Sequence, residues 1–145
     1  MGVSECLHRT RCRARRGVKV YDAVPGRRFL RTNIVAGQCL GRAVAPLEYS
    51  GTTDHVLFEW WFAELFLPRL GEGFTIVMDN ASFHRKKQLA RLARRAKCRL
   101  LFLPAYSPDL NPIENRWANL KAFLRNYSAF FDSLQDAIMD YFQVE

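Results

Sequence analysis

The chain has 145 residues, which is the length of one domain, and 49% of them are hydrophobic, enough to build a core. No apolar run is long enough to span a bilayer, so the composition excludes a membrane-spanning chain. The 22 Lys and Arg against 14 Asp and Glu give a formal net charge of +8, which points to an anionic partner, most simply a nucleic acid. An acidic membrane surface is the weaker alternative, because no stretch resembles an amphipathic anchor.

The first third of the chain predicts a basic arm followed by a hairpin. Residues 1–17 show no hydrophobic period and are expected to form an irregular arm, with a turn at Pro25-Gly26. Residues 29–38 and 40–49 are typical of two strands joined tightly around Gly37 to Gly41. The segment after them predicts a turn into a helix, with Thr52 or Thr53 as the N-cap.

The next helix is expected over about 54–67. It is apolar on almost every side, with Glu59 and Glu64 as its main polar interruptions, so it should lie between a sheet and another layer. Leu67-Pro68 and Gly71 are expected to end it.

The remaining elements alternate between strands and helices. Residues 74–79 and 99–104 are short apolar runs, which predict strands buried on both faces. Helices are expected over about 85–96, 112–126 and 133–143. The order of two strands, then alternating helices and strands, then two helices predicts a mixed α/β sheet covered by helices.

Positive charge and cysteine are distributed unevenly along the chain. Residues 1–31 carry +7 and residues 85–99 carry +8, whereas the rest carries −7. Each basic block either contacts nucleic acid or is only a solvated face. Cys6, Cys12, Cys39 and Cys98 have neither metal-binding nor Cys-x-x-Cys spacing, so reduced thiols are expected. Residues 1–17 lack the apolar centre of a signal peptide.

Two acidic residues are well placed for chemistry. Asp79 comes at the end of a predicted buried strand, where α/β sheets form their sites, although it could also cap the next helix. Glu114 follows Asn111 and Pro112, an expected N-cap and first helical position, so it could instead complete a capping box. If the two carboxylates converge, they could hold Mg²⁺ or Mn²⁺, which favour oxygen ligands and catalyse phosphodiester displacement.

Two motifs resemble the mariner-superfamily insertion-sequence transposases. They are IVMDNASFHRKKQ and LLFLPAYSPDLNPIENRWANLK, and 34 residues separate Asp79 from Glu114, the separation characteristic of that family. The resemblance spans roughly residues 13–127. It implies a ribonuclease-H-like fold, with Asp79 and Glu114 as the second and third members of a DDE triad that binds Mg²⁺ or Mn²⁺ and cuts and joins DNA.

Several neighbouring residues gain expected roles from this resemblance. Asn80 and His84 could position a metal-bound water or a DNA phosphate, or only form local hydrogen bonds. Trp117 is expected in the core rather than as a platform for bases. The candidate DNA contacts are Asn80, His84, Arg85, Lys86, Lys87, Arg91, Arg94, Arg95, Asn115 and Lys121.

The first aspartate of the triad is not found. If Glu5-Cys6 matches the family motif, Ser4 stands in its place, and the alternative is a first strand upstream of Met1. We therefore divide the chain into a basic arm over 1–28, a remnant of the first-strand region, and a catalytic core over 29–145, with the first strand lacking or altered. An open sheet edge is expected as a result.

The incomplete triad predicts that this chain alone is weakly active or inactive. The alternatives are a non-catalytic nucleic-acid-binding remnant, one half of a split transposase, and a ribonuclease-H-like nuclease of another class. Expected partners are DNA, both transposon ends and target, a second polypeptide carrying a helix-turn-helix and the first aspartate, and a second copy. The resemblance to insertion sequences implies a bacterial cytoplasmic protein that is nucleoid-associated when bound to DNA.

Overall fold

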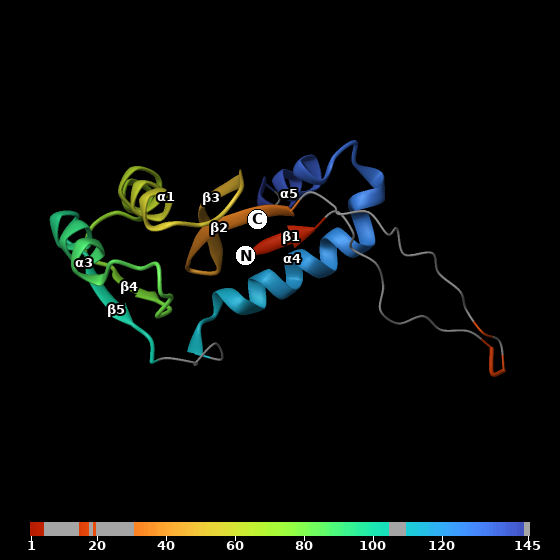
Figure 1. Cartoon of the computed structure of the whole chain (residues 1–145), viewed down its shortest axis with the longest axis horizontal. Helices are drawn as coiled ribbons and strands as arrows, with labels where there is room; N and C mark the ends of the chain where they lie inside the picture. The colour runs from red at the N-terminus through yellow and green to blue at the C-terminus, as the bar shows by residue number, and fades with distance from the viewer. Residues whose placement is uncertain (5–14, 18, 20–30, 105–109, 144–145) are drawn as a thin grey trace.

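The structure is a computed structural model that describes residues 1–4, 15–17, 19, 31–104 and 110–143 (Figure 1). It confirms the mixed α/β architecture. The elements in chain order are β1 (Gly2–Ser4), β2 (Arg31–Cys39), β3 (Arg42–Ser50), α1 (His55–Trp60), the π-helix η1 (Trp61–Phe66), α2 (Leu67–Leu70), β4 (Thr75–Met78), α3 (Lys86–Arg95), β5 (Arg99–Phe102), α4 (Ile113–Tyr127), the 3-10 helix η3 (Ser128–Phe130) and α5 (Leu134–Gln143).

The predicted hairpin is formed by β2 and β3, which pair antiparallel. Leu40 and Gly41 at its turn have φ angles of 49° and 80°, as the tight turns of β-hairpins require. The register shifts between Val35 and Gly37. A Cβ on Gly37 would overlap the ring of Phe66, so a glycine here lets the hairpin and the helical segment approach closely.

A short first strand is present, which corrects part of the sequence interpretation. Residues 2–4 form β1 and pair antiparallel with β2, with Val3 opposite Thr32. The prediction of an irregular arm is therefore wrong for these residues. Val3 is only 2% exposed, and burial of its side chain in a core is the physical reason that this end of the arm is ordered. The turn predicted at Pro25-Gly26 lies outside the described residues.

The predicted helix 54–67 is one helical segment made of α1, η1 and α2. Its N-cap is Asp54, whose Oδ1 accepts the Leu57 N–H at 2.8 Å, so the prediction of Thr52 or Thr53 is wrong. Thr53 instead bonds the hydroxyl of Tyr49. The segment also does not end at Leu67-Pro68.

Pro68 lies inside this continuous segment, directly after the π-helix, and has no backbone N–H to donate to the preceding turn. The helix ends at Gly71, as predicted, in a backbone conformation with φ of 85°.

The sheet is divided into two parts within the described residues. One has the order β1-β2-β3, and the other is the parallel pair β4-β5. In β4, Ile76 and Met78 are buried, whereas Val77 is 44% exposed, and Leu101 of β5 is 54% exposed. The prediction that both strands are buried on both faces is therefore wrong, because only one face of this pair packs into a core.

Two hydrophobic clusters hold the molecule together. The first contains buried side chains of β3, the helical segment, β4 and α3, with Phe62 and Leu89 fully buried. The second joins β1 and β2 to α4 and α5 around Ile34, Leu120 and Leu124. Trp117 is 8% exposed within this second cluster, which confirms its expected place in the core. Within the described residues, no helix is long and apolar enough to cross a membrane.

Candidate metal and nucleic-acid site

Asp79 follows the last residue of β4 and its side chain is 61% exposed. Its Oδ1 accepts the N–H of Ala81 at 3.4 Å, which fixes the turn after the strand. The next helix, α3, begins at Lys86 with Arg85 as N-cap and has no side-chain cap. Asp79 therefore does not cap this helix, and its recorded local role is the hydrogen bond to Ala81.

Glu114 lies in the first turn of α4 and is exposed. The helix begins at Ile113 with Pro112 as its N-cap, one residue later than predicted, so Glu114 is the second helical residue rather than the third. Asn111, the predicted N-cap, accepts the N–H of Ile113 with its Oδ1 at 3.4 Å, but within the described residues no hydrogen bond from the Glu114 side chain completes a capping box. A carboxylate in a first helical turn is stabilised by the partial positive charge of the helix start.

The strand topology places Asp79 at the carboxyl edge of the parallel pair, and Glu114 follows the same pair in the chain. Because β4 and β5 are parallel, with Met78 opposite Phe102, their carboxyl ends lie side by side. Asp79 follows β4, and the chain after β5 leads to Glu114. The Met1 amino group lies near both: burial lowers its pKa, while the negative charges of Glu114 and, more weakly, Asp79 raise it.

The donor chemistry of this pair fits a divalent metal. Two exposed carboxylates offer hard oxygen ligands, and Mg²⁺ commonly combines one or two carboxylates with water and substrate phosphate. Within the part of the chain that the structure describes, no group of three or more His, Cys, Asp or Glu side chains could hold a metal. Asp79 and Glu114 would therefore hold the ion with help from other oxygen ligands.

His84 is buried rather than open to DNA or water. Its side chain is 4% exposed, and its ring packs against Phe58 and Phe83 at centroid distances of 4.4 and 4.5 Å. The ring Nδ1 lies 3.3 Å from the backbone oxygen of Asp79 and 3.4 Å from its Oδ1. Burial, the largest effect, lowers the pKa of His84, and the Asp79 carboxylate opposes this shift.

Arg85 is held in an ion pair that the sequence interpretation missed. Its Nε and Nη2 donate to the two carboxylate oxygens of Glu59, each at 2.6 Å. This bidentate bond lowers the pKa of Glu59 and joins α1 to the start of α3. One feature of the sequence could have indicated this ion pair: Glu59 is one of the two main polar residues in an otherwise apolar helix.

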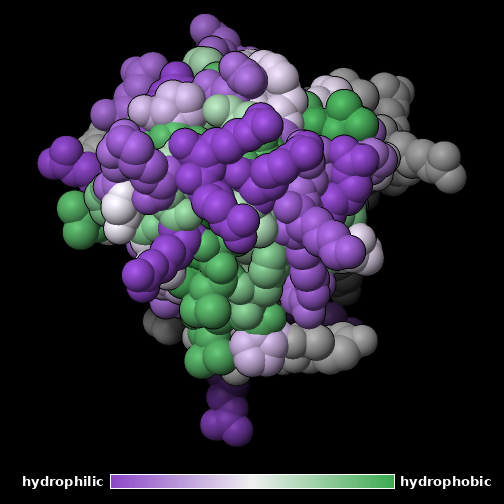
Figure 2. Space-filling model, turned by 90° about the vertical axis from the view of Figure 1, so that its left-hand side faces the viewer, coloured by the Kyte–Doolittle hydropathy of each residue, from purple (hydrophilic) through white to green (hydrophobic). Residues whose placement is uncertain are grey.

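A basic surface covers the outer side of α3. Figure 2 faces this end of the molecule and shows a broad band of hydrophilic side chains above a hydrophobic strip. Lys86 lies over the ring of Phe102 at 5.4 Å, and Arg91 donates to Gln88. A hollow of about 780 Å³ lies at the start of α3. Its lining residues begin six positions after Asp79 in the sequence and are Arg85, Lys86, Lys87, Gln88 and Arg91.

The other predicted DNA contacts are distributed over two regions. Arg94 and Arg95 are exposed near the end of α3, and Asn80 is exposed directly after Asp79. Asn115 and Lys121 lie on α4, the first exposed and the second partly buried. The structure therefore places most of the predicted basic contacts on α3, and only Asn115 and Lys121 of the predicted contacts on the helix of Glu114.

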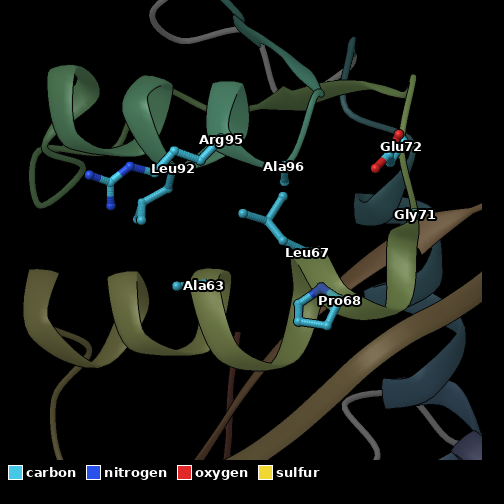
Figure 3. A pocket seen from close by; sticks show the side chains of 8 residues that line it. All are labelled: Ala63, Leu67, Pro68, Gly71, Glu72, Leu92, Arg95 and Ala96. Atoms are coloured by element: carbon cyan, nitrogen blue, oxygen red, sulfur yellow. The ribbon is translucent and has the colours of Figure 1, made fainter.

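A second hollow lies at the other end of α3 (Figure 3). It measures about 430 Å³ and is open between the helical segment and α3. Leu67 and Leu92 extend into it from opposite sides, and Glu72 lies at one end. Its lining is mainly apolar and includes Arg95 and Ala96 from the last turn of α3, whereas Asp79 precedes the first turn. It is thus separate from the carboxylate pair.

The fold is a mixed α/β domain in which Asp79 directly follows the parallel strand β4 and Glu114 lies in the first turn of α4. The chain belongs to the family described as DDE superfamily endonuclease, which matches residues 1–138. Members of this superfamily generally use divalent metal ions.

Similar proteins include three nematode transposases. The chain is 38% identical over 72 residues to the transposable element Tcb2 transposase of Caenorhabditis briggsae, covering 46% of this chain and 26% of that protein. It is 34% identical over 83 residues to the Tcb1 transposase of the same organism, covering 54% of this chain and 30% of that protein. It is also 34% identical over 86 residues to the Tc1 transposase of Caenorhabditis elegans, covering 56% of this chain and 32% of that protein.

The chain matches less than one third of the length of each of these relatives. Their nematode origin gives no support to a bacterial source, which was implied only by the resemblance to insertion sequences.

Proposed function

We propose that this chain is part of the catalytic core of a transposase that cuts and joins DNA, with Asp79 and Glu114 as two of its metal ligands. The observation that carries the proposal is an exposed carboxylate directly after β4 and another in the first turn of α4, the helix that follows the partner strand β5, in a chain of the DDE superfamily endonuclease family. Mg²⁺ or Mn²⁺ bound there would stabilise the attacking and leaving oxygens of a phosphodiester displacement.

The side chains around the carboxylates support a DNA substrate. The exposed basic residues of α3 begin a few positions after Asp79 and continue along the helix, so a phosphate backbone lying on α3 would pass beside the metal site. Lys87, Arg91 and Arg94 are the proposed phosphate contacts on this helix. Arg85 is a weaker candidate than the sequence implied, because its guanidinium is already paired with Glu59.

The proposal is tested by incubating the purified chain with supercoiled DNA and Mg²⁺ or Mn²⁺. Since no group of three possible metal ligands is found among the described residues, we expect salt-dependent DNA binding but cleavage far below that of an intact three-carboxylate enzyme. Any residual cleavage should disappear in Asp79→Asn and Glu114→Gln, and should remain in Glu72→Gln, an exposed acid paired with Lys97. Efficient cleavage that survives Asp79→Asn would contradict the assignment.

A second candidate function is a DNA-binding subunit that requires another polypeptide to complete the metal site. The observation that favours it is the intact basic face of α3 beside an incomplete set of described ligands. Adding a second polypeptide that carries a helix-turn-helix and a strand-borne aspartate would restore cleavage in this case. A second copy of the same chain would restore it only if the active assembly is a homodimer.

A further inference from the structure

The orientation of His84 assigns this residue a role other than contact with DNA or water. Its side chain is 4% exposed and lies against the rings of Phe58 and Phe83, with Phe102 at 6.5 Å. A group enclosed in this way has no access to a phosphate backbone on the surface. Asp79, in contrast, keeps 61% of its side chain exposed.

Hydrogen-bond chemistry fixes the proton of this ring. Two oxygens of Asp79 lie near Nδ1, the backbone oxygen and Oδ1. When the carboxylate is ionised, neither oxygen carries a hydrogen, so both can accept a hydrogen bond but not donate one. The Nδ1 atom must therefore carry the hydrogen, which it donates to the Asp79 backbone oxygen at 3.3 Å, while Oδ1 lies 3.4 Å from the same nitrogen. Nε2 is buried and has no hydrogen-bond partner among the described residues.

We propose that His84 is a positioning residue: its Nδ1–H bonds the Asp79 backbone oxygen and lies beside Oδ1, and so holds Asp79 where its carboxylate binds a divalent metal. This inference rests on the proposed function, because it assigns a support to one of the proposed ligands. The ring is packed against its neighbour Phe83 and against two other segments, α1 through Phe58 and β5 through Phe102, so the direction of its N–H is set by the core. Loss of a residue that supports a metal ligand typically lowers metal affinity by about 10–100-fold.

Two substitutions of His84 separate positioning from packing. His84→Asn keeps an N–H donor close to the place of Nδ1 but loses the ring contacts. His84→Leu keeps apolar bulk among Phe58, Phe83 and Phe102 but loses the donor. A positioning role predicts that the Asn variant retains most of the Mn²⁺ affinity while the Leu variant loses about 10–100-fold. A purely structural role predicts the reverse order.

The affinity is measured on the full chain by titration with Mn²⁺ alone, following the free ion by electron paramagnetic resonance. Thermal unfolding of each variant confirms that it is folded at the temperature of the titration. His55→Leu, which removes the partly buried histidine at the start of α1, is the matched control and should leave the affinity unchanged. Long-range ¹⁵N–¹H spectra should show His84 protonated at Nδ1 and bare at Nε2.

The results distinguish failure of this inference from failure of the proposed function. The proposed metal site itself is wrong if the unmodified chain binds no Mn²⁺, or if the Asp79→Asn variant binds Mn²⁺ as tightly as the unmodified chain. If Asp79-dependent binding is present and His84→Leu leaves it unchanged, the site stands and the positioning role of His84 is overturned. Protonation of His84 at Nε2 in place of Nδ1 would also overturn it.

Discussion

Trp60 and Trp61 are adjacent in the sequence but lie in different surroundings. Trp61 is 3% exposed, and its indole N–H donates to the buried carbonyl of Ala45 at 2.7 Å, whereas Trp60 is 48% exposed. Trp61→Phe should lower the free energy of unfolding by about 1–3 kcal/mol, because it leaves a buried carbonyl without its donor. Trp60→Phe should change it by less than about 0.5 kcal/mol. If urea unfolding gives the same loss of free energy for Trp61→Phe and Trp60→Phe, the hydrogen bond of Trp61 contributes little.

At the residue scale, the sequence predicted the identity of the candidate ligands better than their supports. Asp79 and Glu114 were identified from their motifs, and both lie on exposed positions at the ends of the expected elements. The orientation of His84 could not be predicted, because it depends on Phe58 and Phe102, which come from distant segments. The Glu59–Arg85 pair was missed for the same reason, since 26 positions separate its two members.

The strand β4 has one buried and one exposed face, although its sequence is a continuous apolar run. Ile76 is 6% exposed and Val77 is 44% exposed. Ile76→Thr should therefore reduce the free energy of unfolding by about 2–5 kcal/mol, from a lost core contact and a buried hydroxyl. Val77→Thr keeps the β-branched shape at an exposed position and should be nearly neutral. A large loss for Val77→Thr, measured by thermal unfolding, would mean that this face is covered in solution.

The helix α3 should contribute a large part of the salt dependence of DNA binding. Each proposed phosphate contact releases counterions, so the slope of log K against log salt should become less steep by about 1 for each of Lys87→Ala, Arg91→Ala and Arg94→Ala. Arg69→Ala, an exposed arginine on α2, is the control. Fluorescence anisotropy with a labelled duplex measures the slopes. If the α3 variants and the control give the same slope, α3 is not the DNA-binding surface.

At the scale of the molecule, the sequence predicted the order of elements but not the division of the sheet. Hydrophobic periodicity identified α3, α4 and α5 to within two residues, because each helix buries one stripe. It could not show that β4 and β5 form a pair separate from β1-β2-β3, since strand pairing depends on contacts distant in sequence. The same long-range packing orders β1, where Val3 enters the second cluster.

The two candidate ligands belong to different parts of this architecture, which gives a prediction for the molecule as a whole. Asp79 follows a strand of the first hydrophobic cluster, and Glu114 opens α4, which is packed in the second. A divalent ion held by both would connect the two clusters. At Mg²⁺ concentrations about 100 times the dissociation constant, binding should stabilise the fold by about 2.7 kcal/mol.

Amide hydrogen exchange measures this connection separately in peptides from β4–α3 and from α4. If both carboxylates bind the ion, Mg²⁺ should slow exchange in both regions together, because the ion must be released before either region opens fully. Asp79→Asn and Glu114→Gln should each abolish the effect in both, whereas Glu72→Gln should preserve it. Slower exchange confined to β4–α3, and unchanged by Glu114→Gln, would exclude Glu114 as a ligand and leave the two clusters unconnected by metal.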